Sequence, residues 1–151
     1  MMRAAIVLAD FAETDSGTGK VHIIGAGWSV TGPMPGPHAV VAFIQVPADR
    51  VGDPIPVTLR LADPTGQLVE VQGPAGMQRL EITGQVEMRT PEGWDRSTEL
   101  EATFAANLMG LPLQPGQSYT WSIEVDGKDL ASTGFQVRST PAASQPAQAE
   151  A

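Results

Sequence analysis

The chain of 151 residues contains no cysteine and is poor in histidine and in aromatic residues. Without cysteine it has no disulfide bond and no thiolate metal site, and its redox compartment stays open. The two histidines, His22 and His38, lie in no recognisable catalytic motif. Because a Ser or Thr nucleophile needs a base beside it, this scarcity favours a protein that is not an enzyme. We expect both histidines at the surface or in loops.

Basic residues are also few. The chain has 9 Lys and Arg against 17 Asp and Glu, which gives a net charge of -8. Such a chain repels phosphate backbones and anionic lipid surfaces, so we expect neither nucleic acid nor a membrane as its partner. Its first apolar run, residues 4–9, is shorter than the roughly 7–15 residues of a signal-peptide core or the roughly 20 of a membrane span. We therefore expect a cytoplasmic protein, with association with a virion as the alternative location.

The chain is rich in alternation between apolar and polar residues, and in the residues of turns, with 16 Gly and 13 Pro. A period of two predicts strands with one dry and one wet face, at residues 20–24, 55–61, 80–88, 100–108, 119–125 and 130–138. Residues 4–9 and 39–46 are apolar on both parities, which predicts central or doubly covered strands. Asp126-Gly127 between two strands favours a tight hairpin turn, since glycine accepts a positive φ.

These elements predict an all-β protein of one domain over residues 1–139. The expected architecture is an antiparallel sandwich of two sheets and seven to nine strands, similar to immunoglobulin and fibronectin type III domains. Residues 140–151 are rich in Pro, Ala and Gln and hold nothing large to bury, so we expect a flexible tail there.

Residues 113–119 have the spacing Leu-x-Pro-Gly-x-x-Tyr, which resembles the tyrosine corner of such sandwiches. In that motif the tyrosine hydroxyl bonds back to the backbone a few residues upstream. Here Pro115-Gly116 would turn the chain, Leu113 would cover the ring of Tyr119, and the stripe would continue inward through Trp121, Ile123 and Val125. The polar residues lie on the opposite parity, which favours a sandwich interior over the alternative, an aromatic platform for a sugar or peptide.

Two stretches of the amino-terminal half, Ala9-Asp10-Phe11-Ala12 and Gly19-Lys20-Val21-His22-Ile23-Ile24-Gly25-Ala26-Gly27-Trp28, resemble a widespread bacterial family. So does the later Leu59-Arg60-Leu61-Ala62-Asp63-Pro64-Thr65-Gly66. Its members are known only as a domain of unknown function, frequent in actinobacteria. The resemblance covers about residues 3–138 and implies an immunoglobulin-like sandwich in a small stand-alone protein. It implies no activity and carries over no functional residue.

Acidic side chains come close together in sequence at three places: Asp10, Glu13 and Asp15; Asp49 and Asp53; and Asp126 and Asp129. None has the Asp-x-Asp-x-Asp-Gly spacing of a calcium loop, and turn formation explains them, so we expect no metal and no cofactor; a calcium site is the alternative. The stretch Gly25-Ala26-Gly27 lacks the third glycine and the helix of a phosphate loop, which favours a strand bend with Trp28 as a packing residue.

Trp94 lies in a polar loop, Arg89-Thr90-Pro91-Glu92-Gly93-Trp94-Asp95-Arg96, that offers little to cover an indole. With Arg96 it is a candidate interface anchor, and the alternative is that it folds over the rim of the sandwich. Met34, in a proline-rich loop, is a further candidate contact. We predict an accessory or structural module that acts through protein–protein contacts, by self-association or on a larger particle such as a phage capsid. The alternative is a carbohydrate- or small-ligand-binding module that uses the loop around Trp94.

Overall fold

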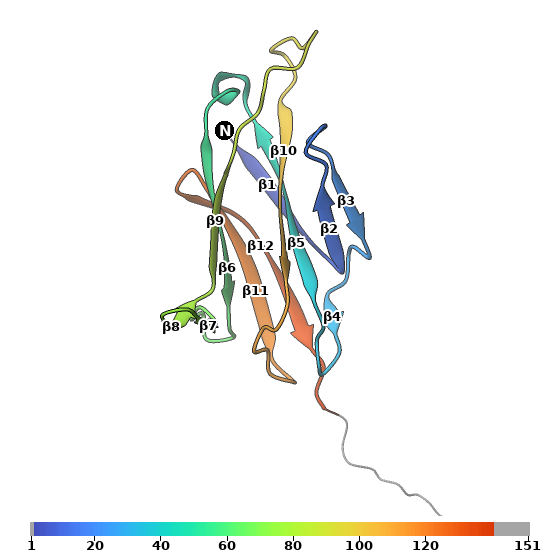
Figure 1. Ribbon diagram of the computed structural model, residues 1–151, viewed down its shortest axis with the longest axis vertical. Coiled ribbons are helices and arrows are strands. Elements are labelled where there is room, and N and C mark those ends of the chain that lie inside the picture. Colours follow the sequence, from blue (N-terminus) through green and yellow to red (C-terminus); the bar gives the residue numbers. More distant parts are fainter. Residues whose placement is uncertain (1, 141–151) are drawn as a thin grey trace, which may run out of the picture.

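The computed structural model describes residues 2–140 as an all-β chain with one short 3-10 turn, η1, at Ala48–Arg50 (Figure 1). The predicted tail, apart from Thr140, lies outside the described residues. No helix within residues 2–140 is long and apolar enough to cross a membrane. The strands are β1 (Arg3–Ala9), β2 (Phe11–Thr14), β3 (Val21–Ile24), β4 (Val30–Thr31), β5 (His38–Val46), β6 (Ile55–Ala62), β7 (Glu70–Gly73), β8 (Gly76–Arg79), β9 (Glu81–Val86), β10 (Leu100–Leu108), β11 (Ser118–Val125) and β12 (Lys128–Val137).

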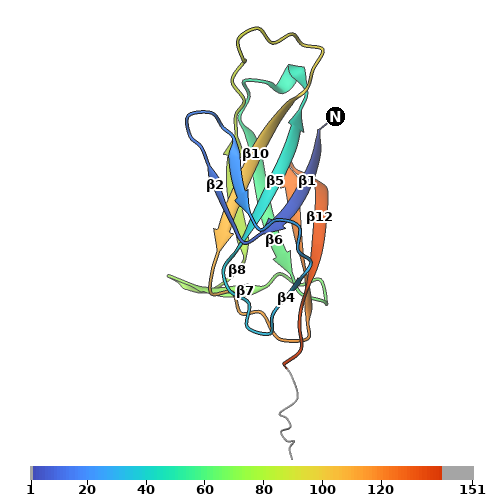
Figure 2. The same ribbon diagram turned by 90° about the vertical axis from the view of Figure 1, so that its right-hand side faces the viewer.

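Eight of these strands form two facing sheets (Figure 2). One has the order β1-β5-β10 and the other β4-β12-β11-β6-β9. Every pair is antiparallel except the short parallel contact between β4 and β12. The predicted all-β sandwich is confirmed, and eight strands fall within the expected number. The alternating pattern did not predict β2, β4, β7 and β8, which are only two to four residues long.

The core lies between the two sheets. The alternate large apolar side chains of β6 and β11 point inward and are buried, among them Leu59, Leu61, Trp121 and Ile123. Burial of a large aliphatic or aromatic side chain stabilises the fold by about 1.5–3 kcal/mol relative to leaving it exposed. The period of two therefore fixes which face of each strand the sandwich covers.

The hairpin β2–β3 covers the outer face of the three-stranded sheet (Figure 1). Beneath it lies a second small core in which Ala12 packs with Ala9, Ala39 and Val41. The side chain of Asn107 in β10 holds the hairpin in place: its Oδ1 accepts from the backbone N–H of Ala12 at 3.1 Å, and its Nδ2 donates to the Ala12 carbonyl at 2.7 Å. The prediction that residues 39–46 form a central or doubly covered strand is confirmed, since β5 lies between β1 and β10. The same prediction for residues 4–9 is wrong, because β1 is an edge strand of this sheet and only Leu8 and Ala9 at its end are buried.

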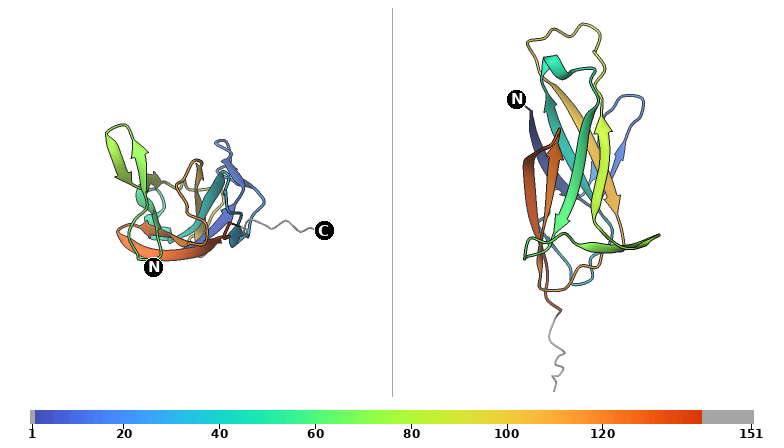
Figure 3. Two further views of the ribbon diagram at one scale, coloured as in Figure 1. Left: turned by 90° about the horizontal axis from the view of Figure 1, so that it is seen from below. Right: turned by 90° about the vertical axis from the view of Figure 1, so that its left-hand side faces the viewer.

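Loops and turns gather at the two ends of the sandwich (Figure 3). At the end where β5 finishes and β10 begins lie the turn η1, the loop 87–99 and the β11–β12 hairpin turn. That turn has positive φ at both Asp126 (55°) and Gly127 (83°), so the predicted tight turn is confirmed. At the opposite end lie the loop 32–37, the hairpin β7–β8 and the connection 109–117 between β10 and β11. We call the first the charged end, after the ion pairs of Arg50, and the second the apolar end, after its exposed methionines.

Candidate functional site

Tyr119 forms a tyrosine corner. Its ring is 4% exposed and stacks on Phe135, with ring centroids 5.8 Å apart. Its hydroxyl accepts a hydrogen bond of 2.8 Å from the backbone N–H of Gln114, while Leu113 is buried beside it and Gly116 turns the chain at φ 82°. This is the bond that the spacing of residues 113–119 predicts. Trp121, Ile123 and Val125 continue the stripe into the core and are closed to solvent.

One edge of Tyr119 borders a groove of about 760 Å³ that also contains Asp63, Glu70 and Arg79. An acid in the same groove as a tyrosine would suggest chemistry, but the carboxylate of Asp63 is occupied in its own turn. It accepts from the backbone N–H of Thr65 at 2.9 Å and of Gln67 at 3.1 Å, and from the Thr65 hydroxyl. The hydroxyl bond leads the contacts that lower the pKa of Asp63, which therefore serves its turn as an ionised acceptor.

His38 does not lie at the surface, and the prediction that it does is wrong. It is 5% exposed, at the start of β5, where the doubly covered strand buries its first residue along with the rest. The imidazole lies among Trp28, Trp121 and Phe135, with ring centroids 5.5–6.1 Å away. His22, in contrast, is exposed, as predicted.

The protonation state of His38 follows from its neighbours. Trp121 donates its buried Nε1–H to Nε2 of His38 at 3.2 Å, so this nitrogen acts as an acceptor and Nδ1 carries the proton. Burial lowers the pKa of His38 below its ordinary value of 6.5, since the charged form would lose hydration. The ring is therefore neutral at pH 7 and serves as the acceptor that the core tryptophan needs.

Beside His38 lies a cavity of about 470 Å³, which we call the indole cavity. Trp28, His38 and Phe135 form its aromatic wall, and Asp10 and Arg138 contribute charges of opposite sign. The Nε1–H of Trp28 is buried without an acceptor among the described residues. A buried donor left in this state costs about 1–3 kcal/mol. Such a group calls for an explanation, because folded proteins rarely leave one.

Trp94 is half-buried within its own loop. Its indole Nε1–H donates to the carbonyl of Thr98 at 2.7 Å, and Asp95 holds the following turn by accepting from the backbone N–H and the hydroxyl of Ser97. Trp94 lines none of the three grooves described in this section. Arg96 is exposed in the same loop, at the charged end.

Met34 is 90% exposed and lies at the apolar end, so the structure does not bring it together with Trp94 and Arg96. Five other large hydrophobic side chains of the described residues are exposed. Met77 and Met109 line a groove of about 480 Å³ with Val71, Leu80 and Leu111, which we call the methionine groove. Val30 lines the indole cavity, and the remaining two, Phe11 and Ile24, pair with each other in the β2–β3 hairpin.

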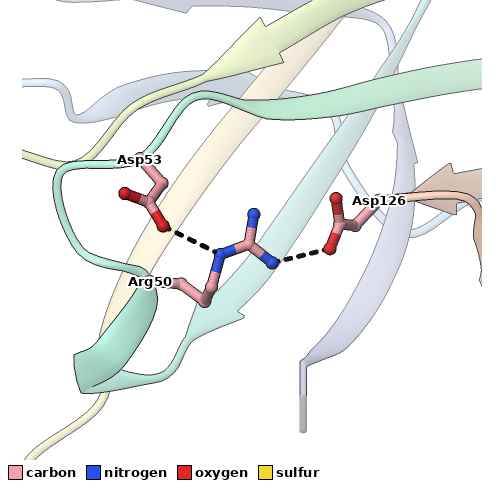
Figure 4. Close-up of polar contacts among 3 residues, drawn as sticks. All are labelled: Arg50, Asp53 and Asp126. Carbon is pink, nitrogen blue, oxygen red and sulfur yellow. Dashed lines mark hydrogen bonds and ion pairs between the residues drawn. The ribbon is translucent and has the colours of Figure 1, made fainter.

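The acidic residues near the charged end are held by arginine (Figure 4). Nε of Arg50 lies 3.1 Å from Asp53, and its NH1 lies 2.6 Å from Asp126, which ties η1 to the β11–β12 turn. The hydrogen bond from Arg50 lowers the pKa of Asp126 and so keeps the carboxylate ionised. Within residues 2–140, no group of three or more His, Asp or Glu side chains is placed to hold a metal ion. Asp15 instead caps its own turn by accepting from the Gly17 N–H at 2.8 Å.

Sequence reasoning missed three features. These are the pairing of His38 with Trp121, the clamp from Asn107 to Ala12, and the ion pair from Arg50 to Asp126, and each joins residues 76 or more positions apart. The sequence holds a signal only for His38. Residues 39–46 are apolar on both parities, and a predicted strand that began one residue earlier would have included His38 among its buried positions.

No curated protein matches the chain. The expected resemblance to a domain of unknown function is confirmed at the level of the family. The sequence pattern of the family of unknown function DUF6941 matches residues 4–138, so the chain belongs to that family.

Proposed function

We propose that this chain is a non-enzymatic sandwich module that acts through protein–protein contacts made by its apolar end. The observation that carries the proposal is that three of the six exposed large hydrophobic side chains of the described residues, Val30, Met77 and Met109, line two grooves at that end. A fourth, Met34, lies in the loop 32–37 at the same end. Single exposed hydrophobics are common on any protein surface and need no explanation. A gathered set beside grooves is typical of an interaction surface.

The distribution of charge supports the same choice. Three of the five ion pairs of the described residues, from Arg3 to Glu99 and from Arg50 to Asp53 and Asp126, lie at the charged end. Charged residues are depleted from the centres of protein interfaces, whereas methionine is enriched there. The methionine groove, in which Glu70 is the one charged lining residue, therefore suits a protein partner better than the loop of Trp94 and Arg96 does.

We propose a second copy of the chain as the first partner. The apolar end has projecting side chains, such as Met34 and Met77, and also the two grooves that can receive them. A two-fold contact between identical surfaces needs both features on one face. The immunoglobulin-like character of the sandwich, which the tyrosine corner supports, belongs to the same proposal. We also propose that the protein is bacterial and cytoplasmic, and that it can decorate a larger particle such as a phage capsid.

Light scattering during size-exclusion chromatography tests the proposal over a series of protein concentrations. We expect the wild type to approach twice the monomer mass of 15.9 kDa as its concentration rises. The double variant Met77→Ser/Met109→Ser should stay monomeric, and the control Trp94→Ser at the other end should behave as the wild type.

A strictly monomeric wild type that also captures no protein from a native lysate would contradict the proposal. Dissociation by Trp94→Ser but not by the methionine variant would show that the contact lies at the charged end instead. If the wild type is monomeric but captures a protein that the methionine variant loses, the apolar end stands and the partner is a different chain.

A further inference from the structure

We infer that the indole cavity is a binding site for a small ligand that joins a carboxylate to an apolar body. The inference goes beyond the proposed function and does not rest on it, since a monomer that contacts no other protein can still bind such a ligand. The cavity volume of about 470 Å³ lies within the roughly 300–1,000 Å³ of small-molecule sites.

Two rings that line the cavity, Trp28 and His38, have an N–H donor for which no acceptor is found within residues 2–140. The buried Nε1–H of Trp28 has no acceptor within residues 2–140. His38 accepts through Nε2 from Trp121, so its other ring nitrogen is an N–H donor in the neutral ring. Both rings line the same cavity. An acceptor that enters it would give the indole N–H the partner that the described residues lack.

The charges of the cavity favour an ionised acceptor over a neutral carbonyl. Arg138 lines the cavity, and its planar guanidinium suits a carboxylate through two parallel N–H donors. Asp10 lines the same cavity and opposes an anion. Its carboxylate lies against Gly25, where an added Cβ would collide with it. Removal of the Arg138 charge should weaken the binding of an anion, and removal of the Asp10 charge should strengthen it. One variant at each position therefore separates the two effects.

Apolar residues also line the cavity and can contact the apolar body of the ligand. Phe135, Leu113, Pro35 and Pro37 line the cavity beside the charged groups, and Val30 contributes an exposed side chain at its margin. Proline and phenylalanine side chains lose little conformational freedom when a ligand binds, so they contribute contact area at low entropic cost. A phenyl ring with a short acidic chain matches this combination of wall and donors.

Nuclear magnetic resonance of the full chain tests the site directly. The three tryptophans give three indole N–H signals, which the variants Trp28→Phe and Trp94→Phe assign. The probe is 3-phenylpropionate, with 3-phenylpropionamide and 3-phenylpropylamine as controls that keep the phenyl body and change the charge. We expect the acid, raised to about 10 mM, to shift the Trp28 signal as a site of millimolar affinity fills, while the Trp94 signal, already bonded to Thr98, stays in place.

Variants of exposed side chains then test the charges without disturbing the core. We expect Arg138→Gln to weaken binding of the acid about fivefold and Asp10→Asn to tighten it about twofold, as losses of single exposed charge interactions. The control Arg96→Gln, at the charged end, should leave the affinity unchanged.

Three results would overturn the inference. The first is a Trp28 signal that does not move with the acid. The second is an equal or larger response to the amide or the amine, which would show that the carboxylate is not what the cavity recognises. The third is an affinity that Arg138→Gln leaves unchanged.

Discussion

Removal of a single oxygen atom tests whether Tyr119 locks the sandwich. In Tyr119→Phe the ring keeps its stacking on Phe135, but the backbone N–H of Gln114 loses its acceptor at 2.8 Å. A hydrogen bond is worth about 0.5–1.5 kcal/mol net, and a buried donor left unpaired costs about 1–3 kcal/mol. Because this bond is partly buried, we expect the free energy of unfolding to fall by about 1–2 kcal/mol.

Urea unfolding followed by tryptophan fluorescence measures this loss. With a slope near 2 kcal/mol per molar, the unfolding midpoint should drop by about 0.5–1 M, and the slope itself should not change. Thr120→Val is the matched control, since Thr120 is the next residue of β11 and its side chain faces solvent. We expect that control to stay within about 0.5 kcal/mol of the wild type. A loss in Tyr119→Phe no larger than in the control would refute the role of the hydroxyl.

Two further perturbations test other parts of the fold. Asn107→Ala removes both hydrogen bonds to Ala12, so amide exchange in residues 12–23 should accelerate by about tenfold or more while the loop 89–99 is unaffected; unchanged exchange in the hairpin would show that packing alone holds it. For His38 the folded pKa lies below the ordinary 6.5, so the unfolded chain binds the proton more readily. The contribution of neutral His38 to the free energy of unfolding is therefore fully present above pH 6.5. It is lost as the pH falls from 6.5 toward the lower pKa of the folded state. His38→Gln should abolish this slope and the exposed control His22→Gln should keep it; a slope that persists in His38→Gln would contradict the assignment.

Much of the fold was predictable because its signals are local. The alternation of residues 100–108 gives β10 its ends, and the spacing of residues 113–119 gives the tyrosine corner, since both depend on neighbours within a few positions. The short strands β2, β4, β7 and β8 were not predictable. They have only two to four residues each, which leaves little room for a period of two, and β4 pairs with the distant strand β12.

The proposed interaction surface was predictable only in part, because the sequence does not tell an exposed hydrophobic residue from a buried one. Met34 stood out among prolines and glycines, and it is exposed. Met77 and Met109 carry no such signal, and they form one groove only because the hairpin β7–β8 comes beside the connection that follows β10. Trp94 stood out equally, but its own loop supplies the partner of its indole N–H.

Amide hydrogen exchange in the associated state tests the central claim most directly. Exchange is compared between dilute chain and chain at the concentration where its mass doubles, or with the captured partner bound. The account predicts slower exchange in residues 30–37, 70–79 and 109–117 around the two grooves, with the loop 89–99 unchanged. Protection confined to the loop of Trp94 and Arg96, with the grooves exchanging as before, would contradict it.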